Sequence, residues 1–398
     1  MRVGSWSVGV VVASSALLVS SRHALGQNAP PKKLPHYRVD VVENTTFGGY
    51  GYDINDRGQV ALPSVTPPIP SGIVPRRWDP RDGFLTLAPG PASATGINNH
   101  GDVTVVHEGD SRFLSSLWTE RDGLTDLGTI GRQTWADDVN DHQVVVGWTE
   151  RDTDARERYA FRWTRDGGLQ PLPNLPGGHE GGAAFDVTNK GLIVGYSYGA
   201  SGQEAVRWVD GKAQGLGDFP GGWYESAATA ANERGQIVGV GHMGGDGSDL
   251  DGDEQPDSIA RAFLWSEEKG MIDLGALGAD HNSVAYDITD DGMVVGYSVK
   301  RPGGTSLAFT PFLWTEETGM IDVHTLLDED SRDWRLGGFQ IARVNESGQI
   351  LLHGMRDNQF AVVVLTPHNP EPGGLLWIAG AGAALGLRRA RVRAPSAG

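Results

Sequence analysis

One segment of the chain carries carboxylates at the spacing that a calcium ion requires. Asp249, Asp251, Asp253 and Asp257 occupy the first, third, fifth and ninth places of a short polar stretch. Alternate spacing in a tight loop directs several hard oxygen atoms at one point, and the backbone carbonyl of Gln255 would supply the seventh place. The sequence therefore predicts a Ca²⁺ cofactor here; the alternative is an acidic loop that water solvates.

Aromatic and histidine side chains form a second candidate site. They stand where one repeat of the chain passes into the next. Aromatic rings stack on the apolar face of a sugar, and with hydrogen-bonding groups around a concave mouth they are typical of a ligand site. The candidates for glycan binding are Trp135, His179, Trp223, Tyr224 and His281. The alternative is that they are ordinary residues of connecting loops.

Catalytic motifs are missing from the sequence. The chain has no cysteine, which excludes thiolate nucleophiles and thiolate metal sites. His179-Glu180 is not part of a His-Glu-x-x-His pattern, and no Gly-x-Ser-x-Gly elbow is present. We therefore expect no enzyme and no catalytic residues. The alternative is a secreted carbohydrate-active enzyme, a glycosidase or lyase, because the separation of a carboxylate pair is a three-dimensional quantity.

A repeated phrase indicates which elements must position these residues. It consists of an apolar residue, Asn or Thr, two polar residues, usually Gly, and a β-rich run. Asn or Asp before Gly favours a tight turn between two strands, because glycine accepts a positive φ. Each phrase therefore predicts a β-hairpin. The seven phrases begin at Ile54, Ile97, Val139, Val187, Ala231, Ile288 and Val344.

A second phrase that ends in tryptophan follows six of the hairpins. Typical examples are Phe263-Leu264-Trp265 and Phe312-Leu313-Trp314, each followed by a charged turn and one more short strand. Four-strand units of about 40–45 residues are typical of propeller blades. The sequence thus predicts an all-β fold, a seven-bladed β-propeller over residues 36–367, with the tryptophans packed between blades.

The repeat array is incomplete at its C-terminal end and begins with one strand that belongs to no unit. The seventh unit has no fourth strand, and a strand-like run over residues 37–42 precedes the first hairpin. If the N-terminal run completes the last blade, no sheet edge is left unpaired. In that ring, the loop after each second strand shares a face with the blade-linking loops, so the acidic loop and the aromatic residues border one funnel.

The N-terminus has the pattern of a secretory signal peptide. Residues 1–26 contain a basic start, an apolar run and small residues before Gln27. The run is short for a membrane anchor, which is the alternative. Six of the 33 basic residues lie in the two chain ends, and none of the 50 acidic ones do, so residues 27–387 carry a net charge of −23. An acidic exported body argues against nucleic-acid or anionic-lipid binding.

The C-terminus has three parts in a fixed order. Pro370, Glu371 and Pro372 lie in a linker over 368–374. An apolar segment over 375–387, expected to be a short helix, and a basic tail over 388–398 follow. Arginines after an apolar segment are expected on the cytoplasmic side of a membrane. A plain tail anchor is the alternative reading.

The C-terminal tail and the repeats each resemble a known bacterial family. The tripartite tail resembles the PEP-CTERM sorting signal, which implies an exosortase-type processing enzyme as a partner and a membrane contact only before processing. The repeats resemble HAF-type extracellular repeats, whose phrase survives as Ala160-Phe161 and Ala262-Phe263. That resemblance implies an exported protein and no particular activity.

Taken with the residue patterns, these resemblances predict a protein that is secreted or held at the cell surface, transiently anchored by its C-terminal segment. It would bind a glycan or a matrix protein without catalysis, with Ca²⁺ stabilising one loop. A spacer in the extracellular matrix is a further possibility.

Overall fold

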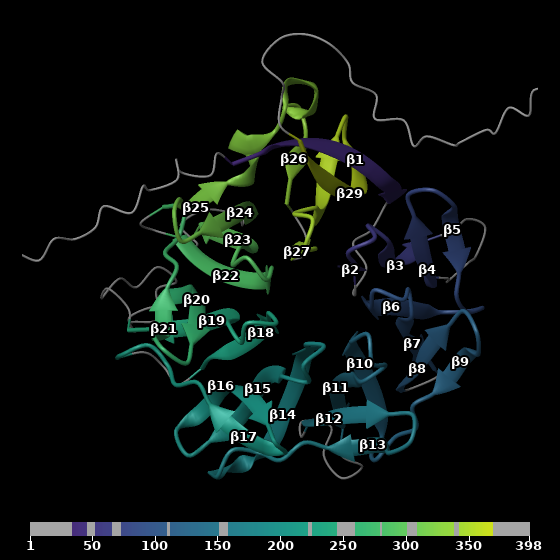
Figure 1. The fold of residues 1–398 in the computed structure, drawn as a ribbon, viewed down its shortest axis with the longest axis vertical. Helices are drawn as coiled ribbons and strands as arrows, with labels where there is room; N and C mark the ends of the chain where they lie inside the picture. Colours follow the sequence, from purple (N-terminus) through teal and green to yellow (C-terminus); the bar gives the residue numbers. More distant parts are fainter. Residues whose placement is uncertain are drawn as a thin grey trace, which may run out of the picture. The chain divides into compact units, whose positions relative to one another are not determined.

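The structure is a computed structural model that describes residues 34–45, 52–65, 73–109, 112–150, 158–221, 225–244, 259–278, 281–300, 309–337 and 342–368. The chain divides into two compact units, Met1–Leu34 and Pro35–Gly398, and every described strand belongs to the second. In that unit the described strands form seven antiparallel sheets arranged in a ring (Figure 1). The predicted all-β, seven-bladed propeller is confirmed; the predicted C-terminal helix lies outside the described residues.

Blades 1 to 6 each contain four strands that follow one another in chain order from the centre of the ring outward (Figure 1). Blades 1 and 2 contain β2 (Asp53–Ile54), β3 (Val60–Val65), β4 (Ile73–Asp79), β5 (Gly83–Thr86), β6 (Ala92–Ile97), β7 (Val103–Glu108), β8 (Phe113–Thr119) and β9 (Gly123–Asp126). Blades 3 and 4 contain β10 (Gln133–Val139), β11 (Val145–Glu150), β12 (Arg158–Thr164), β13 (Gly168–Pro171), β14 (Gly177–Val187), β15 (Ile193–Gly199), β16 (Gly202–Val209) and β17 (Lys212–Gly215). Blades 5 and 6 contain β18 (Ala227–Ala231), β19 (Ile237–Met243), β20 (Ile259–Ser266), β21 (Gly270–Asp273), β22 (His281–Ile288), β23 (Val294–Lys300), β24 (Phe309–Thr315) and β25 (Gly319–Asp322).

Blade 7 joins the two ends of the array. Its inner strands are β27 (Ala342–Val344), β28 (Ile350–Arg356) and β29 (Gln359–His368), and β1 (His36–Thr45) pairs antiparallel with β29. The predicted closure by the N-terminal strand is therefore confirmed. Two short 3₁₀ helices, η1 (Val323–Leu326) and η2 (Glu329–Ser331), and strand β26 (Arg335–Leu336), which pairs with β28, were not expected from the repeats.

A glycine in the second strand explains the Val-Val-Gly part of the repeat. A Cβ atom on Gly147 of β11 would lie 2.0 Å from the carbonyl oxygen of Trp135 in β10. Gly195, Gly239 and Gly296 face the same close approach, at 2.0 to 2.1 Å. Only glycine tolerates a neighbouring backbone at that distance. Next to Gly147, a β-bulge between Ala136 and Asp138 interrupts the pairing of β10 and re-aims the end of this inner strand.

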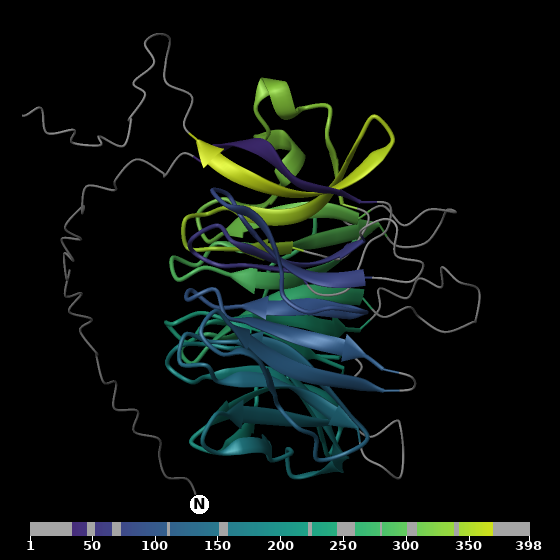
Figure 2. The same ribbon diagram turned by 90° about the vertical axis from the view of Figure 1, so that its right-hand side faces the viewer.

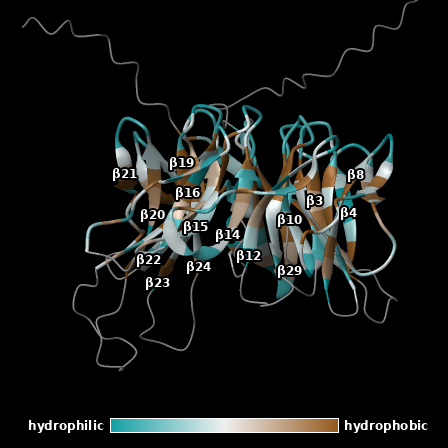
Figure 3. Ribbon diagram, turned by 90° about the horizontal axis from the view of Figure 1, so that it is seen from below, coloured by the Kyte–Doolittle hydropathy of each residue, from teal (hydrophilic) through white to brown (hydrophobic). Residues whose placement is uncertain are grey.

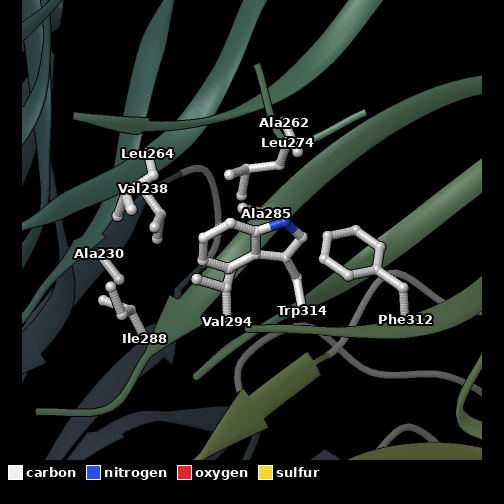
Figure 4. Packing of buried hydrophobic residues seen from close by; sticks show 10 residues of the cluster. All are labelled: Ala230, Val238, Ala262, Leu264, Leu274, Ala285, Ile288, Val294, Phe312 and Trp314. Carbon is white, nitrogen blue, oxygen red and sulfur yellow. The ribbon is translucent and has the colours of Figure 1, made fainter. Parts of the chain in front are cut away.

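The hydrophobic core lies between neighbouring blades. Figure 4 shows Trp314 of blade 6 packed beside Val238, Leu264 and Leu274 of blade 5. Burying a side chain of this size stabilises the fold by several kcal/mol, about 3–5 kcal/mol relative to alanine. The predicted packing of the repeat tryptophans between blades is confirmed for Trp314, and Figure 3 shows apolar segments of the strands below the polar turns of the upper edge.

We predict that deleting residues 34–45 abolishes the cooperative fold. The deletion removes the partner of β29 and leaves a long apolar edge strand, since Val362 to Leu365 are buried. Thermal unfolding followed by circular dichroism should lose its main transition, and the protein should aggregate. Arg38→Ala, which removes an exposed side chain of β1, serves as the control and should melt like the wild type. A deletion variant with an unchanged transition contradicts the closure.

Candidate functional site

The strand connections define two faces of the ring (Figure 2). The loop face carries the connections from second to third strands and from one blade to the next. The turn face carries the hairpin turns of the repeated phrase. Trp135, His179 and His281 lie in the first three residues of β10, β14 and β22, which begin at the loop face.

Several predicted site residues lie outside the described residues. They are Trp223 and Tyr224, the metal candidates Asp249, Asp251, Asp253, Gln255 and Asp257, and the sorting residues Pro370, Glu371 and Pro372. Of His281 only the backbone is described, paired with Lys300. Among the described residues, no group of three His, Cys, Asp or Glu side chains is arranged to hold a metal ion. No helix in those ranges is long and apolar enough to cross a membrane.

Trp135 belongs to a stack of rings in blade 3. Its ring lies parallel to that of Trp148 in β11, with a 6.0 Å centroid separation and a 6° interplanar angle. Phe113 of blade 2 meets Trp135 edge-on at 5.1 Å. On the other side, the guanidinium of Arg158 lies 4.0 Å from the centre of the Trp148 ring. The stack therefore ends in a cation–π pair.

His179 belongs to a second group of rings in blade 4. Its imidazole lies 3.8 Å from the ring centre of Tyr198, which in turn contacts Tyr196 at 5.9 Å. Tyr196 also contacts Phe185 of β14 at 5.7 Å. Arg158 hydrogen-bonds to Tyr196, so this arginine connects the two groups, and burial raises the pKa of the Tyr196 hydroxyl. We call the combined set the aromatic belt: Phe113, Trp135, Trp148, Arg158, His179, Phe185, Tyr196 and Tyr198.

Sequence reasoning found two members of the aromatic belt and missed the rest. Trp148, Tyr196 and Tyr198 follow the Val-Val-Gly phrase at alternating positions of β11 and β15. That alternation is a detectable signal, because residues two apart in a strand share a face. The bridging role of Arg158 has no such signal, since β12 and β15 belong to different blades.

A second set of candidate residues lies on the inner strands that surround the central channel, two residues before the Asn or Thr of each repeated phrase. We call these the channel residues: Asp53, Gly96, Asp138, Asp186, Ala230, Asp287 and Arg343. Each of the four aspartates accepts a backbone N–H from the next blade. For example, the N–H of Ala231 donates to Asp186 Oδ2 at 2.7 Å, and that of Val344 donates to Asp287 Oδ2 at 2.8 Å.

One guanidinium stands among these carboxyl groups. Arg343 Nε lies 3.8 Å from Asp53 Oδ1, and the arginine also interacts with Asp138, Asp186 and Asp287. Burial, reinforced by the neighbouring Asp138, raises the pKa of Asp53 to about 8. Burial raises the pKa of Asp287 to about 6, although Arg343 opposes the rise. The channel therefore binds protons more tightly than exposed aspartates do.

Asp138 and Asp186 form a carboxyl pair. Their side chains hydrogen-bond to each other, and burial raises the pKa of both. Like charges so close disfavour double ionisation, so the pair holds a proton more tightly than an isolated carboxyl group does. Glycoside hydrolysis needs carboxyl groups about 5–9.5 Å apart on either side of the bond, so a pair in contact does not fit that role.

Comparison with known proteins places the chain by fold. No family model and no curated protein sequence matches it, so membership of the HAF-type repeats stays a prediction. A streptogramin B lyase structure is similar, with a TM-score of 0.50 and 10% identity over 84% of this chain and 98% of that chain. The β-propeller domain of the Trilobed protease from Pyrococcus furiosus is similar with a TM-score of 0.47 and 14% identity, over 80% and 94% of the two chains. At such identities the likeness shows the propeller fold alone.

We predict that the channel aspartates make the protein less stable as the pH rises. Their folded-state pKa values, about 8 for Asp53 and about 6 for Asp287, lie above the ordinary value of 3.8, so the folded state binds more protons. The stability that this supplies is complete below the unfolded pKa and is lost as the pH rises through the folded pKa. Melting temperatures at constant ionic strength should therefore fall between pH 5 and 9.

The variant Asp53→Asn isolates this effect. It should flatten the fall in melting temperature between pH 7 and 9, where Asp53 loses its proton. Asp166→Asn, which changes an exposed carboxylate in the outer turn of blade 3, should keep the wild-type slope. A wild-type slope in Asp53→Asn contradicts the assignment.

Proposed function

We propose that the protein is an exported cell-surface or extracellular-matrix propeller that binds a glycan at its loop face without catalysis. The observation that carries this proposal is the aromatic belt, which spans blades 2 to 4 and contains Trp135 and His179. Aromatic rings with nearby polar groups provide stacking for sugar rings and hydrogen bonds for their hydroxyls.

Polar groups beside the belt suit this role. Tyr159 donates a 2.7 Å hydrogen bond to Glu180 Oε2, which fixes that carboxylate next to His179. His179 and Glu180 are exposed, and Trp135, Tyr196 and Tyr198 are half-buried, so rings and hydrogen-bonding groups are both accessible. A sugar could contact an aromatic face and a charged side chain together.

Two alternatives remain as outcomes of the test. An enzyme is the first, since four blades place carboxyl groups in the channel; the contact between Asp138 and Asp186 disfavours a glycosidase that uses this pair. A matrix protein in place of a glycan is the second, because aromatic and arginine side chains are also enriched in protein interfaces.

We predict that an array of neutral, amino-sugar and uronic-acid oligosaccharides contains at least one ligand. Trp135→Ala and Tyr198→Ala should each weaken binding to that ligand about fivefold, because loss of one aromatic stacking partner costs on the order of 1 kcal/mol. Phe84→Ala is the matched control, since Phe84 is an exposed ring, 42% accessible, on the outer strand of blade 1.

The same oligosaccharides serve to test catalysis. Incubation with the protein should release no reducing ends or unsaturated products. Release that disappears in a channel variant such as Asp287→Asn would favour the enzyme. Failure of every oligosaccharide to bind, or unchanged binding by both belt variants, contradicts the proposal.

Calcium binding is part of the proposal and rests on the spacing of Asp249, Asp251, Asp253 and Asp257. We predict a single Ca²⁺ site in calorimetric titration, with a rise in melting temperature at saturating Ca²⁺ because only the folded loop brings the carboxylates together. The double variant Asp251→Ala, Asp253→Ala should lose both effects, whereas Asp166→Asn should keep them. Equal heats for both variants would favour the solvated acidic loop.

Export and sorting complete the proposal. The signal-like residues 1–26 support export, and Pro370, Glu371 and Pro372 before an apolar and basic tail support processing by an exosortase-type enzyme. In this scheme the protein contacts the membrane only through its C-terminal segment and ends at the surface or in the matrix.

A further inference from the structure

The chain enters and leaves the ring at the turn face of blade 7. Strand β29 pairs antiparallel with β28, which starts at the hairpin turn, so β29 runs from the loop face to the turn face (Figure 2). Near its end, a Cβ atom on Gly348 of that turn would lie 3.7 Å from Cγ of Pro367. His368, the last described residue, is paired with His36 of β1, which therefore begins at the same face.

Contacts with three elements fix the end of β29 on the ring. His368 Nε2 lies 3.1 Å from Oδ2 of Asp328, which precedes η2. The N–H of Asp328 in turn donates to the carbonyl oxygen of Tyr37 in β1 at 3.0 Å, and the Tyr37 side chain is fully buried. The point from which the C-terminal segment starts is therefore set by the fold of blade 7.

A short linker joins this point to the apolar segment over 375–387. It consists of six residues, 369–374, which span at most about 20 Å in any conformation. The seven residues of β28 extend about 23 Å from the turn face of blade 7 to its loop face. A ring with its loop face against a membrane would need the linker to run back along the whole blade, and six residues are too short for that path.

The aromatic belt lies far from the linker in two respects. Its rings stand toward the loop face: Trp135 is near the start of β10, and Tyr198 is near the end of β15. Its members also belong to blades 2 to 4, which lie across the ring from β29 (Figure 1). The belt is therefore remote from a membrane that holds residues 375–387.

This geometry decides between two kinds of contact for the belt. Aromatic side chains are enriched where proteins meet lipid headgroups, as well as in sugar-binding sites. Contact with the headgroups of the anchoring membrane would require the loop face to approach that membrane, which the linker does not allow. A partner of the belt must therefore come from outside this membrane.

The turn face has no charge pattern that would bind it to anionic lipids. Its hairpin turns, from residues 55–59 in blade 1 to 345–349 in blade 7, carry seven carboxylates and three Lys or Arg side chains. Attraction to anionic headgroups requires clusters of basic residues. The linker, and not adhesion of the turn face, therefore sets the orientation.

We propose that the C-terminal linker holds the ring with its turn face toward the membrane and so presents the aromatic belt outward, to a glycan of the surroundings. This inference rests on the membrane contact in the proposed function. It adds which face is presented, and it excludes the lipid headgroups of the same membrane as the partner of the belt.

Energy transfer from single labels to a bilayer tests the orientation, because a chain without cysteine accepts one introduced thiol at a chosen position. His142→Cys places a fluorophore on the turn face of blade 3, and Ser201→Cys places it on the loop face of blade 4; both side chains are exposed. Protein from Gln27 onward, which keeps every described strand, is bound to phosphatidylcholine vesicles that contain a headgroup-labelled acceptor lipid. We expect stronger transfer from position 142 than from position 201.

A longer linker is the control. Inserting about twenty Gly and Ser residues after His368 raises the reach of the linker above the height of the blade and should remove most of the difference. Equal transfer from the two positions with the natural linker, or stronger transfer from position 201, overturns the inference. Protein that does not sediment with the vesicles contradicts the membrane contact in the proposed function, and the inference falls with it, whereas glycan binding is measured separately.

Discussion

The whole ring depends on hydrogen bonds that the hairpin turns make from blade to blade. Asn140 shows the arrangement: its Oδ1 accepts the N–H groups of His142 and Val144 in its own turn, both at 3.0 Å. Its Nδ2 donates to the carbonyl of Thr188 in the next blade at 2.9 Å. Asn345 donates in the same way to Asn55 at 2.9 Å, so the last blade is bonded to the first. One side chain thus forms the turn and the contact between blades.

Two interfaces lack this amide but keep the hydrogen bond of a channel aspartate, whereas the interfaces after Asn55 and Asn140 have both. Thr188 and Thr289 can accept the N–H of their own turn, but they have no Nδ2 to donate to the next blade. At these interfaces Asp186 and Asp287 accept an N–H of the next blade from within the channel. Blades 2 and 5 show the opposite combination, with Asn98 and Asn232 in the turn and small residues in the channel.

These aspartates have two consequences for the molecule. They secure neighbouring blades, and they concentrate carboxyl groups in a buried space where ionisation is costly. Arg343 offsets part of that cost on the side of blades 7 and 1, and burial raises the pKa of both Asp138 and Asp186. The channel therefore has a chemistry of its own, distinct from that of the aromatic residues on the loop face.

The repeated phrases were sufficient to predict the hairpins and the number of blades, because turns and the pairing of successive strands depend on residues close in the chain. The closing strand followed from counting strands, since the last unit lacked one and the N-terminus had one to spare. The unmatched strands at the two ends of the array also indicated that the N-terminal strand β1 pairs with β29. Nothing in the phrases predicted η1, η2 or β26, since the segment between blades 6 and 7 does not follow the repeat.

The residues of the candidate sites were predicted less completely. Trp135 and His179 stand in recognisable linking segments, but Arg158 reaches Tyr196 from a different blade, and Arg343 meets Asp53 across 290 positions of sequence. When the repeats are aligned, the channel position contains Asp, Gly, Asp, Asp, Ala, Asp and Arg in turn. The pKa shifts of these residues depend on their burial and on the distances between them, which the sequence does not give. Local spacing specifies each blade, whereas closing the ring brings one position of every blade to the same axis and so creates the channel and its shifted pKa values.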